Sequence, residues 1–415
     1  MLDVRPGRPI RGRVRVPGDK SVSHRALLFG SIAQGVTRIR GLLESEDTRA
    51  TARAVAQLGR RVWREQGDVF VQGGPWRDAD ETIDCGNSGT TARLVLGALA
   101  GRATATLDGD ASLRRRPMAR VTRPLAAMGA DVDAAPTLPL RVRRAALRGV
   151  DWRAEVASAQ VKSALLLAGL HAEGPTVYHE PIATRDHTER MLTAMGATIE
   201  AVDGRVTLWP GPLRALDVTV PGDISSAAFW MVAASIVAGS DLVLENVGLN
   251  PTRTGVIDVL REMGADLEVH AYDGGAEPAG DVRVRAAPLR GVIVSGARIP
   301  RLIDEIPVLA VAAAFASGTT EVRDAAELRV KESDRVAATV AGLRALGCAA
   351  DARPDGMIIE GGGALHAGEV ASEGDHRIAM AFAVAGARVG ARIRDPDNIA
   401  TSYPDFVATL ERLRA

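Results

Sequence analysis

The chain has 415 residues, 46% of them hydrophobic and 25% charged, so it is long enough to form two or more globular cores. Its 51 basic and 51 acidic side chains cancel, and only 3% of the residues are aromatic, which argues against a nucleic-acid partner. The longest apolar run, from Ile306 to Ala316, is too short to cross a bilayer, and the first residues lack the apolar core of a secretion signal. We therefore expect a cytoplasmic protein that binds neither nucleic acid nor membrane.

Cysteine and lysine are both scarce in this sequence. Cys85 and Cys348 lie in no metal-binding spacing and are expected to be buried free thiols. The basic residues include only three lysines, Lys20, Lys162 and Lys331, against 48 arginines. An ammonium group is compact and its pKa is easily adjusted. Each lysine is therefore a candidate site residue, with an ordinary surface position as the alternative.

A repeat of 65 to 79 residues runs through the chain. Helix-like stretches that lead into β-rich segments end near six glycines, Gly35, Gly101, Gly174, Gly239, Gly318 and Gly390. Between them a second phrase recurs as VAQLGRRV, LAAMGADV, LTAMGATI, LREMGADL and LRALGCAA, which predicts a helix end, a glycine cap and a strand start. Each unit also contains hairpin strands, such as Arg205 to Trp209 and Met357 to Glu360. A solenoid is the alternative, although solenoid periods are usually about 20–50 residues.

A longer repeat divides the six units into two halves of three. The phrase Val16-Pro17-Gly18-Asp19 recurs 204 residues later as Val220-Pro221-Gly222-Asp223. Proline and glycine suit a hinge, so the chain is expected to cross between two domains at both phrases. Residues 1–18 would then join 224–415 in a discontinuous domain, with 19–223 as the inserted domain.

Polar residues precede all six alanine-rich helices. A single serine or aspartate there is an ordinary helix cap, but the repetition favours sites for anions, which helix N-termini attract. The six signatures are Gly18-Asp19-Lys20-Ser21, Gly86-Asn87-Ser88-Gly89-Thr90, Ser158-Ala159-Gln160, Gly222-Asp223-Ile224-Ser225, Asp304-Glu305 and Asp375-His376-Arg377. The first lacks the glycines of a P-loop, and no dinucleotide-binding glycine motif follows a strand. ATP, nicotinamide and flavin are therefore not expected.

Cations lie beside these caps, which suits an anionic ligand. They are Lys20, Arg25, Arg116, Lys162, Arg185, Lys331, Arg335 and Arg377. Arg116 is expected to point inward, whereas Arg114 and Arg115 fit a solvated loop. The spacing places Lys331 and Arg335 on one helix face, for a site or for surface ion pairing.

Two carboxylates and one histidine lie where they could take part in a site. Asp304 and Glu305 open an apolar helix, where burial and cations can tune acid–base behaviour, although Asp304 could instead be a cap. His376 is a candidate for orienting a ligand. The histidines expected at the surface are His171, His179, His270 and His366, while His24 and His187 remain intermediate. No pair has the spacing of a metal site.

Nine phrases together resemble the 3-phosphoshikimate 1-carboxyvinyltransferase family of enolpyruvyl transferases, in order from residue 16 to about 406. They are VPGDKSVSHRALL, GNSGTTARL, SLRRRPMARV, SAQVKSALLLAGL, TRDHTERML, VPGDISSAAFW, LIDEIPVLAVAAA, ELRVKESDR and DHRIAMA. The resemblance implies an α/β fold of two pseudo-equivalent domains, each with three βαβαββ units in an inside-out α/β barrel. Two crossover strands would join the domains, with helix N-termini pointing into the cleft between them.

The resemblance also implies the reaction. The enolpyruvyl group of phosphoenolpyruvate would pass to the 5-hydroxyl of shikimate 3-phosphate through a tetrahedral intermediate that loses phosphate, in chorismate and aromatic amino acid biosynthesis. No metal or organic cofactor is implied, and we expect a monomer. Anionic substrates would let the two cation-bearing halves close on one another.

The site residues follow by position in the family pattern. Asp304 would take the hydroxyl proton, and Glu332 and Lys20 would handle proton transfer at the phosphoenolpyruvate carbon and the leaving phosphate. Shikimate 3-phosphate would contact Lys20, Ser21, Arg25, Ser158, Ala159, Gln160, Arg185, Asp304 and Lys331. Phosphoenolpyruvate would contact Lys20, Gly89, Arg116, Gln160, Arg335 and Arg377. Lys162 would be a neighbour of the cleft.

Three positions depart from some family members, which have serine, asparagine and lysine where Ala159, Glu327 and Thr401 stand. Gly89 keeps the small residue, so the phosphoenolpyruvate pocket is expected to admit glyphosate. The rival enolpyruvyl transferase acts on UDP-N-acetylglucosamine and has asparagine where Ser21 stands, and usually a cysteine in the loop near Arg116, which this chain lacks. A non-enzymatic repeat scaffold is the second rival.

Overall fold

The structure is a computed structural model that describes residues 1–273 and 275–414. It divides into an inserted unit, Gly18–Val220, and a discontinuous unit that joins Met1–Pro17 to the chain from Pro221 onward. The inserted unit starts one residue and ends three residues before the boundaries expected from the sequence.

Backbone hydrogen bonds explain the earlier boundary at the second V-P-G-D phrase. The amide of Val220 donates to the Arg40 carbonyl of the inserted unit at 2.9 Å. Two residues later, the amide of Gly222 donates to Asn246 at 2.7 Å, within the discontinuous unit. The chain therefore crosses inside the phrase, between Val220 and Gly222, rather than after it.

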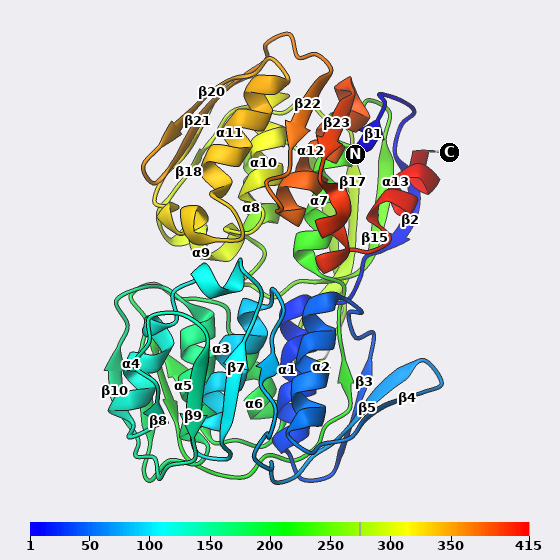
Figure 1. The fold of residues 1–415 in the computed structure, drawn as a ribbon. Helices are drawn as coiled ribbons and strands as arrows, with labels where there is room; N and C mark the ends of the chain where they lie inside the picture. Colours follow the sequence, from blue (N-terminus) through cyan, green and yellow to red (C-terminus); the bar gives the residue numbers. More distant parts are fainter. Residues whose placement is uncertain (274, 415) are drawn as a thin grey trace. The chain divides into compact units, whose positions relative to one another are not determined.

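The inserted unit contains three successive β-α-β-α-β-β repeats, if the returning strand β14 is counted as the first strand of the first repeat (Figure 1). Its helices are α1 (Lys20–Ile32), α2 (Glu46–Gln57), α3 (Gly89–Leu99), α4 (Ala119–Ala127), α5 (Ala159–Gly169) and α6 (His187–Ala194), with the 3-10 helix η1 (Leu113–Arg115). Its strands are β3 (Val36–Arg40), β4 (Val62–Glu65), β5 (Asp68–Gln72), β6 (Ile83–Asp84), β7 (Ala105–Asp108), β8 (Asp131–Val132), β9 (Leu140–Arg143), β10 (Asp151–Arg153), β11 (Thr176–His179), β12 (Ile199–Val202), β13 (Arg205–Leu208) and β14 (Val218–Thr219).

These strands form three four-stranded sheets with the same internal plan. Their orders are β14-β3-β5-β4, β6-β7-β9-β8 and β10-β11-β13-β12. In each sheet the first two strands are parallel, and an antiparallel hairpin completes the sheet. The repeat predicted from the sequence is thus present.

The discontinuous unit repeats the plan with one change. Its helices are α7 (Ile224–Ile236), α8 (Gly255–Glu262), α9 (Ile299–Leu302), α10 (Ile306–Ala314), α11 (Arg335–Ala345), α12 (His376–Val389) and α13 (Phe406–Arg414), with η2 (Gly296–Arg298), η3 (Ala326–Val330) and η4 (Pro396–Thr401). Its strands are β1 (Leu2–Val4), β2 (Arg11–Arg15), β15 (Asp241–Gly248), β16 (Asp266–Ala271), β17 (Ala279–Arg285), β18 (Ile293–Val294), β19 (Gly318–Val322), β20 (Ala349–Arg353), β21 (Gly356–Gly361), β22 (Gly368–Ala371) and β23 (Ala391–Arg394).

Two of its sheets have four strands, in the orders β16-β17-β15-β2 and β18-β19-β21-β20, and the third is β1-β23-β22. The third sheet ends differently because β1, from the start of the chain, lies antiparallel to β23 at the place where a hairpin strand lies in the other sheets. Strand β2 pairs in parallel with β15, so the first residues belong to this unit.

In each unit, the alanine-rich helices form the interior and the sheets face outward (Figure 1). All thirteen residues of α7 and all nine of α10 are buried. Small residues let such helices pack closely: a Cβ on Gly97 of α3 would lie 2.3 Å from the carbonyl oxygen of Ala164 on α5. Burial on every face explains why α7 and α10 consist mostly of small and apolar residues and have no polar face.

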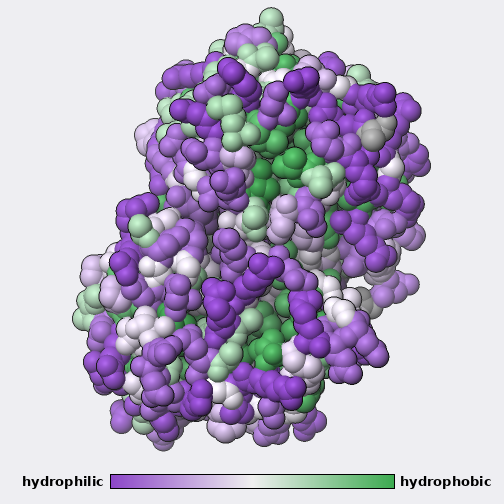
Figure 2. Space-filling view, turned by 45° about the vertical axis from the view of Figure 1, so that its right-hand side comes forward, coloured by the Kyte–Doolittle hydropathy of each residue, from purple (hydrophilic) through white to green (hydrophobic). Residues whose placement is uncertain are grey.

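Hydrophilic side chains predominate on the face of the molecule shown in Figure 2. Val36, Val202 and Ile293, three of the large apolar side chains that are exposed, come from three separate strands. Within residues 1–273 and 275–414, no helix is both long enough and apolar enough to span a membrane.

Candidate functional site

Three interior helices of the inserted unit begin at side-chain caps. Asp19 accepts a hydrogen bond from the Val22 amide at 2.8 Å at the start of α1. Ser88 and Ser158 cap α3 and α5 in the same way. Each cap fixes where the helix starts and aims the positive end of its dipole at the residues placed there.

Side-chain hydrogen bonds hold the starts of α3 and α5 together. Gln160 on α5 donates through Nε2 to the hydroxyl of Thr90 on α3 at 2.9 Å. Its Oε1 atom accepts from the Arg93 guanidinium at 2.5 Å. The side chain of Gln160 is therefore fixed at both ends, beside Gly89 and Thr90.

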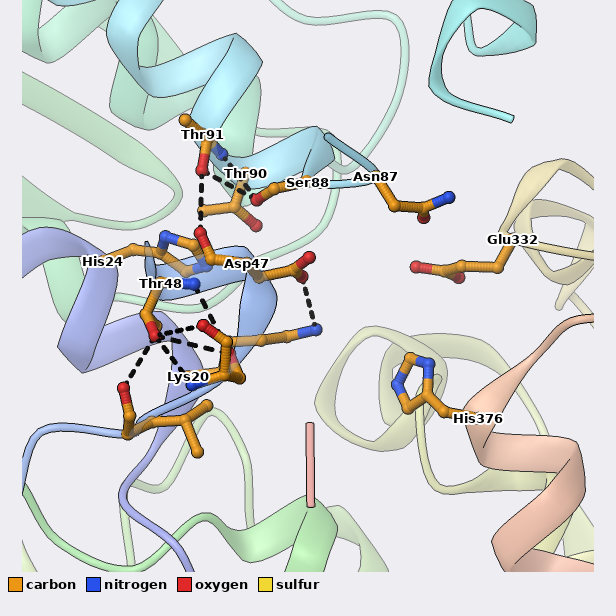
Figure 3. A network of polar contacts seen from close by, with 12 residues as sticks. Lys20, His24, Asp47, Thr48, Asn87, Ser88, Thr90, Thr91, Glu332 and His376 are labelled. Carbon is orange, nitrogen blue, oxygen red and sulfur yellow. Dashed lines mark hydrogen bonds and ion pairs between the residues drawn. The ribbon is translucent and has the colours of Figure 1, made fainter. Parts of the chain in front are cut away.

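Lys20 is the first residue of α1, and its ammonium pairs with Asp47 of α2 (Figure 3). The Nζ–Oδ2 distance is 3.1 Å, and the two side chains are 17% and 9% exposed. Thr91 of α3 donates to the backbone carbonyl of Asp47 at 3.3 Å, and Thr91 Oγ1 lies 2.7 Å from Thr51 Oγ1. The lysine thus has a fixed carboxylate partner yet keeps some access to solvent.

Arg116 follows η1 and is 8% exposed. Its guanidinium donates to the side-chain oxygen of Asn87 at 2.5 Å and to the Asn87 carbonyl at 3.2 Å, just before α3 begins. Arg116 therefore points inward, as predicted, toward Gly89. Arg114 differs because it pairs with Asp108 and is largely exposed.

Arg25 lies one turn into α1 and is almost fully buried. It donates to Thr188 at 2.8 Å, to Ser163 at 2.7 Å and to the carbonyl of Ser21 at 3.0 Å. Its position therefore depends on α5 and α6 as well as on its own helix. Arg185 is half-buried in the segment between β11 and α6.

In the discontinuous unit, three cations surround the carboxylate of Asp304. Asp304 Oδ1 lies 3.7 Å from Lys331 Nζ and 3.1 Å from an Nη atom of Arg335. Arg377 lies 4.0 Å from the other carboxylate oxygen and donates to the backbone carbonyl of Asp304 at 3.2 Å. The carboxylate is 13% exposed, so it is held in place but remains accessible.

Arg335 connects three carboxylates of this unit. It pairs with Asp375 at 2.8 Å, with Glu332 at 2.7 Å and with Asp304 at 3.1 Å, while its own side chain is 1% exposed. Burial alone would raise the pKa of Asp375, but the Arg335 guanidinium lowers it below the ordinary value. Burial would lower the pKa of Arg335, yet the charges of Asp375, Glu332 and Asp304 raise it. Asp375 and Arg335 are therefore both charged at neutral pH.

The structure corrects the prediction that Lys331 and Arg335 share one helix face. Helix α11 begins only at Arg335, because Asp334 caps it by accepting from the Ala337 amide at 3.0 Å. Lys331 lies before that cap, in extended backbone after η3. The two cations meet at Asp304 through the loop rather than through helical spacing.

A side-chain cap at Asp304 or Glu305 is also not observed. Glu305 occupies the position before α10 without making a capping hydrogen bond, and Asp304 precedes it. Glu305 is buried and accepts from Ser225 and, at 3.5 Å, from Arg253. Five of the six predicted helix starts therefore have side-chain caps, and the sixth has a buried ion pair instead.

A family model of EPSP synthase (3-phosphoshikimate 1-carboxyvinyltransferase) matches residues 4–410. The chain belongs to the EPSP synthase family. It is therefore a transferase, and the nine phrases of the sequence reflect membership of this family. A relative from Desulforudis audaxviator named 3-phosphoshikimate 1-carboxyvinyltransferase is 52% identical over 425 residues, covering 100% of this chain and 99% of the relative. One of the same name from Thermus thermophilus is 52% identical over 420 residues, covering 99% and 98%.

Solved structures agree with this family. EPSP synthase from Acinetobacter baumannii has a TM-score of 0.89 and 42% identity, with 99% of this chain and 98% of that chain covered. The enolpyruvyl transferase NikO from Streptomyces tendae has a TM-score of 0.81 and 20% identity, covering 99% and 96%, which shows a shared fold. The predicted two-domain α/β fold is thus confirmed.

Two residues that contact candidate site residues of this EPSP synthase family member were not selected from the sequence. Asp47 pairs with Lys20, and Arg93 bonds to Gln160. Asp47 follows Ser45, whose capping box starts α2, so this helix start resembles those that were selected. Arg93 lies within the phrase GNSGTTARL but was not distinguished from a surface arginine. Only the fold reveals that it bonds to Gln160.

The structure also places the cysteines and histidines considered in the sequence analysis. Cys85 and Cys348 are free and buried, as expected. His270 and His366 are exposed, whereas His179 is half-buried and lies 2.9 Å from Asp151. Across the described residues, no cluster of three or more histidine, cysteine, aspartate or glutamate side chains could hold a metal ion.

The three departures also have defined positions. Ala159 is the first residue of α5, Glu327 lies in η3, and Thr401 ends η4.

Proposed function

We propose that this protein transfers the enolpyruvyl group of phosphoenolpyruvate to the 5-hydroxyl of shikimate 3-phosphate and releases phosphate, in chorismate biosynthesis. The observation that carries the proposal is the carboxylate of Asp304, which lies within 4.0 Å of cationic nitrogens of Lys331, Arg335 and Arg377. A base among cations suits a hydroxyl that must be deprotonated beside anionic groups.

Shikimate 3-phosphate carries a phosphate, a carboxylate and hydroxyl groups. The residues proposed to bind it are Lys20, Ser21, Arg25, Ser158, Ala159, Gln160, Arg185, Asp304 and Lys331. The starts of α1 and α5 support this proposal, because each combines a capped helix N-terminus with polar side chains. Ala159 would contribute its backbone alone.

Phosphoenolpyruvate is smaller and carries a phosphate and a carboxylate. The residues proposed to bind it are Lys20, Gly89, Arg116, Gln160, Arg335 and Arg377. Support comes from Arg116 and Gln160, which are both fixed beside the start of α3. Planar guanidinium groups match a carboxylate or phosphate with paired hydrogen bonds.

The proposal requires both units. The inserted unit holds Lys20 and Arg116, and the discontinuous unit holds Asp304, Glu332 and Arg377. We propose that these two sets act on one pair of substrates. Neither set by itself combines the acid–base groups with all the anion-binding groups.

In the addition step, the 5-hydroxyl oxygen forms a bond to C2 of phosphoenolpyruvate, and Asp304 accepts the hydroxyl proton. The electrons of the enol double bond take a proton at C3, which Glu332 or Lys20 supplies. Elimination then breaks the bond from C2 to the phosphate oxygen and returns a proton from C3, which restores the double bond. Glu332 is 22% exposed and is oriented by Arg335, so its carboxyl can reach a bound molecule.

Phosphate release with each acceptor tests this function. We expect release from phosphoenolpyruvate with shikimate 3-phosphate but not with UDP-N-acetylglucosamine, the acceptor of the rival transferase. An Asp304→Ala variant is expected to lose about 100-fold to 10,000-fold in kcat, as is usual when a general base is removed.

Asp351→Asn is the matched control for this variant. Asp351 is an exposed carboxylate of the same unit that pairs with Arg344, so its loss should leave kcat within about twofold. Failure of both acceptors with folded protein would contradict the proposed reaction. Turnover by Asp304→Ala at the wild-type rate would contradict the role of Asp304 alone.

We propose that the protein is a cytoplasmic monomer that binds small anionic substrates and no nucleic acid. The two free cysteines support the cytoplasm, because free thiols are usual in a reducing compartment. The zero formal net charge supports the absence of a nucleic-acid partner. A sedimentation measurement that gave twice the chain mass would contradict the monomer.

A further inference from the structure

Lys162 is one of only three lysines, and the proposed reaction gives it no task. It lies in α5, two residues beyond Gln160, and its side chain is 1% exposed. Its ammonium contacts two carboxylates, Glu180 Oε2 at 3.1 Å and Glu189 Oε1 at 2.5 Å. Lys162 therefore forms a buried cluster in which one cation lies between two acids.

The first carboxylate leads to the segment that carries Arg185. Glu180 follows β11, and its Oε1 atom accepts hydrogen bonds from the amide of Thr184, at 3.2 Å, and from the Thr184 hydroxyl. Thr184 directly precedes Arg185. The path from Lys162 through Glu180 thus fixes the backbone next to this arginine.

The second carboxylate leads to Arg25. Glu189 lies in the first turn of α6, next to Thr188, which accepts a hydrogen bond from Arg25 Nε at 2.8 Å. Thr188 also lies 2.6 Å from the hydroxyl of Ser163, the residue after Lys162. The path through Glu189 thus fixes the start of α6 and, through it, the guanidinium of Arg25.

We propose that Lys162 is a positioning residue that sets the relative placement of Arg25 and Arg185, and thereby the affinity for shikimate 3-phosphate. This inference rests on the proposed function, because it takes these two arginines as contacts of that substrate. Lys162 itself lies inside the unit and makes no contact with substrate.

Stability alone does not account for such a cluster. Taking a lysine and two glutamates out of water is costly, and well-packed apolar residues often stabilise a core as well as or better than a buried ion pair. Burial raises the pKa of Glu189, and Lys162 opposes that shift. What an ammonium provides, and an apolar side chain does not, is directed hydrogen bonds to two different chain segments.

The test compares substrate binding with turnover. Lys162→Met keeps an unbranched side chain, one atom shorter, and removes its charge. We expect the Kd for shikimate 3-phosphate, measured by calorimetry on the free enzyme, to rise about tenfold or more. At saturating substrates, kcat should change by less than about threefold. Asp304 and Glu332 lie in the other unit, and Lys20 pairs with Asp47 of α2, which is not part of the Lys162 cluster.

A second variant keeps the test decisive if Lys162→Met folds poorly. Thr184→Val replaces the hydroxyl that bonds to Glu180 by a methyl group and leaves the ion cluster intact. It should raise the same Kd about threefold to tenfold, without changing the KM for phosphoenolpyruvate by more than about twofold.

Val142→Ala is the matched control. Val142 is fully buried on β9, in a sheet that supplies neither Thr184 nor Glu189, and its truncation costs stability alone. Folded Lys162→Met and Thr184→Val proteins with the wild-type Kd would overturn the inference. A wild-type enzyme with no activity toward shikimate 3-phosphate would instead overturn the proposed function.

Discussion

Gly89 shows how a single atom can test the proposed phosphoenolpyruvate site. A Cβ built on Gly89 would lie 3.2 Å from a terminal nitrogen of Arg116 and 3.2 Å from one of Arg93. Both atoms are ends of flexible side chains, so Gly89→Ala should fold while the two guanidinium groups move by a few tenths of an ångström. The added methyl group therefore acts on the cations that hold the anion.

We expect Gly89→Ala to raise the KM for phosphoenolpyruvate several-fold. The inhibition constant of glyphosate is expected to rise by a larger factor. Initial rates at saturating shikimate 3-phosphate, with and without glyphosate, give both values. Gly86→Ala is less suitable as a control because Gly86 has a positive φ of 56°. Ala92→Gly, in the same helix, is a better one. Unchanged glyphosate sensitivity in Gly89→Ala would contradict the placement of phosphoenolpyruvate at this helix start.

His24 makes the stability of the inserted unit depend on pH. Burial lowers the pKa of His24 well below its ordinary value, and the charges of Lys20 and Arg25 lower it further. The unfolded chain therefore binds a proton at a higher pH than the folded chain does. Stability is fully present above the unfolded pKa, near 6.5, and is lost as the pH falls below it toward the folded pKa.

Between about pH 7.5 and pH 5, this group should account for a loss of roughly 1–2 kcal/mol in the free energy of unfolding. Urea denaturation at both pH values measures this loss. In His24→Asn, the free energy of unfolding is expected to fall by roughly 1–2 kcal/mol less than in wild type between about pH 7.5 and pH 5. His366→Asn, at an exposed position, should behave as wild type does. Equal losses in His24→Asn and wild type would contradict this account of His24.

The capped interior helix is the element that recurs in both units. Ser88 is a clear example because its hydroxyl accepts from the Thr91 amide at 3.1 Å and from the Thr91 hydroxyl at 2.8 Å, and the residue is fully buried. Removing it would leave the first turn of α3 with an unsatisfied donor.

Ser88→Ala is expected to lower the free energy of unfolding by about 1–2 kcal/mol. Ser295→Ala is the control, because Ser295 precedes η2 without making a capping bond, and its loss should cost less than about 0.5 kcal/mol. Urea titrations compare the two. A Ser88→Ala protein as stable as wild type would show that α3 does not depend on this cap.

The sequence predicted these interior helices well because both of their signals are local. An acceptor side chain at the cap and an alanine-rich stretch behind it are read over a few residues. Lys331 was misplaced for the same reason, since the spacing of four residues to Arg335 fits a helix until Asp334 is recognised as its cap. The pair of Lys20 and Asp47 could not be predicted, because it depends on how α1 packs against α2.

At the scale of the whole molecule, the positive charge of the proposed site residues is distributed unevenly between the two units. In the discontinuous unit, Lys331, Arg335 and Arg377 are balanced by Asp304, Glu332 and Asp375. The positive excess among the proposed site residues is therefore in the inserted unit. An anionic substrate is expected to bind there first.

We expect shikimate 3-phosphate to draw the two units together, because the proposed contacts come from both. Small-angle scattering should show a smaller radius of gyration when it is added. Shikimate without the phosphate, at the same concentration, should have less effect. A radius of gyration that does not change with saturating shikimate 3-phosphate would contradict closure.

The sixfold repeat and the crossing phrases predicted the architecture of the whole chain, because each repeat unit has the same local pattern. The sequence did not reveal that β1 completes the last sheet in place of a hairpin strand. That pairing joins Leu2 to Ile393, residues that no local pattern connects.

The pairing of β2 with β15 has a consequence for folding during synthesis. The amide of Ile10, just before β2, donates to the hydroxyl of Ser240, 230 residues further on, just before β15. If a ribosome adds about 5–20 residues per second, β15 is synthesised roughly 10–50 s after β2. In that interval the inserted unit can fold, and its β14 then pairs with β3. This brings Val220 against Gly18, where a Cβ would lie 3.1 Å from a methyl carbon of Val220. Folding of the inserted unit thus replaces a loop of about two hundred residues between β2 and β15 by a much shorter one. The entropic cost of closing the discontinuous unit is therefore smaller.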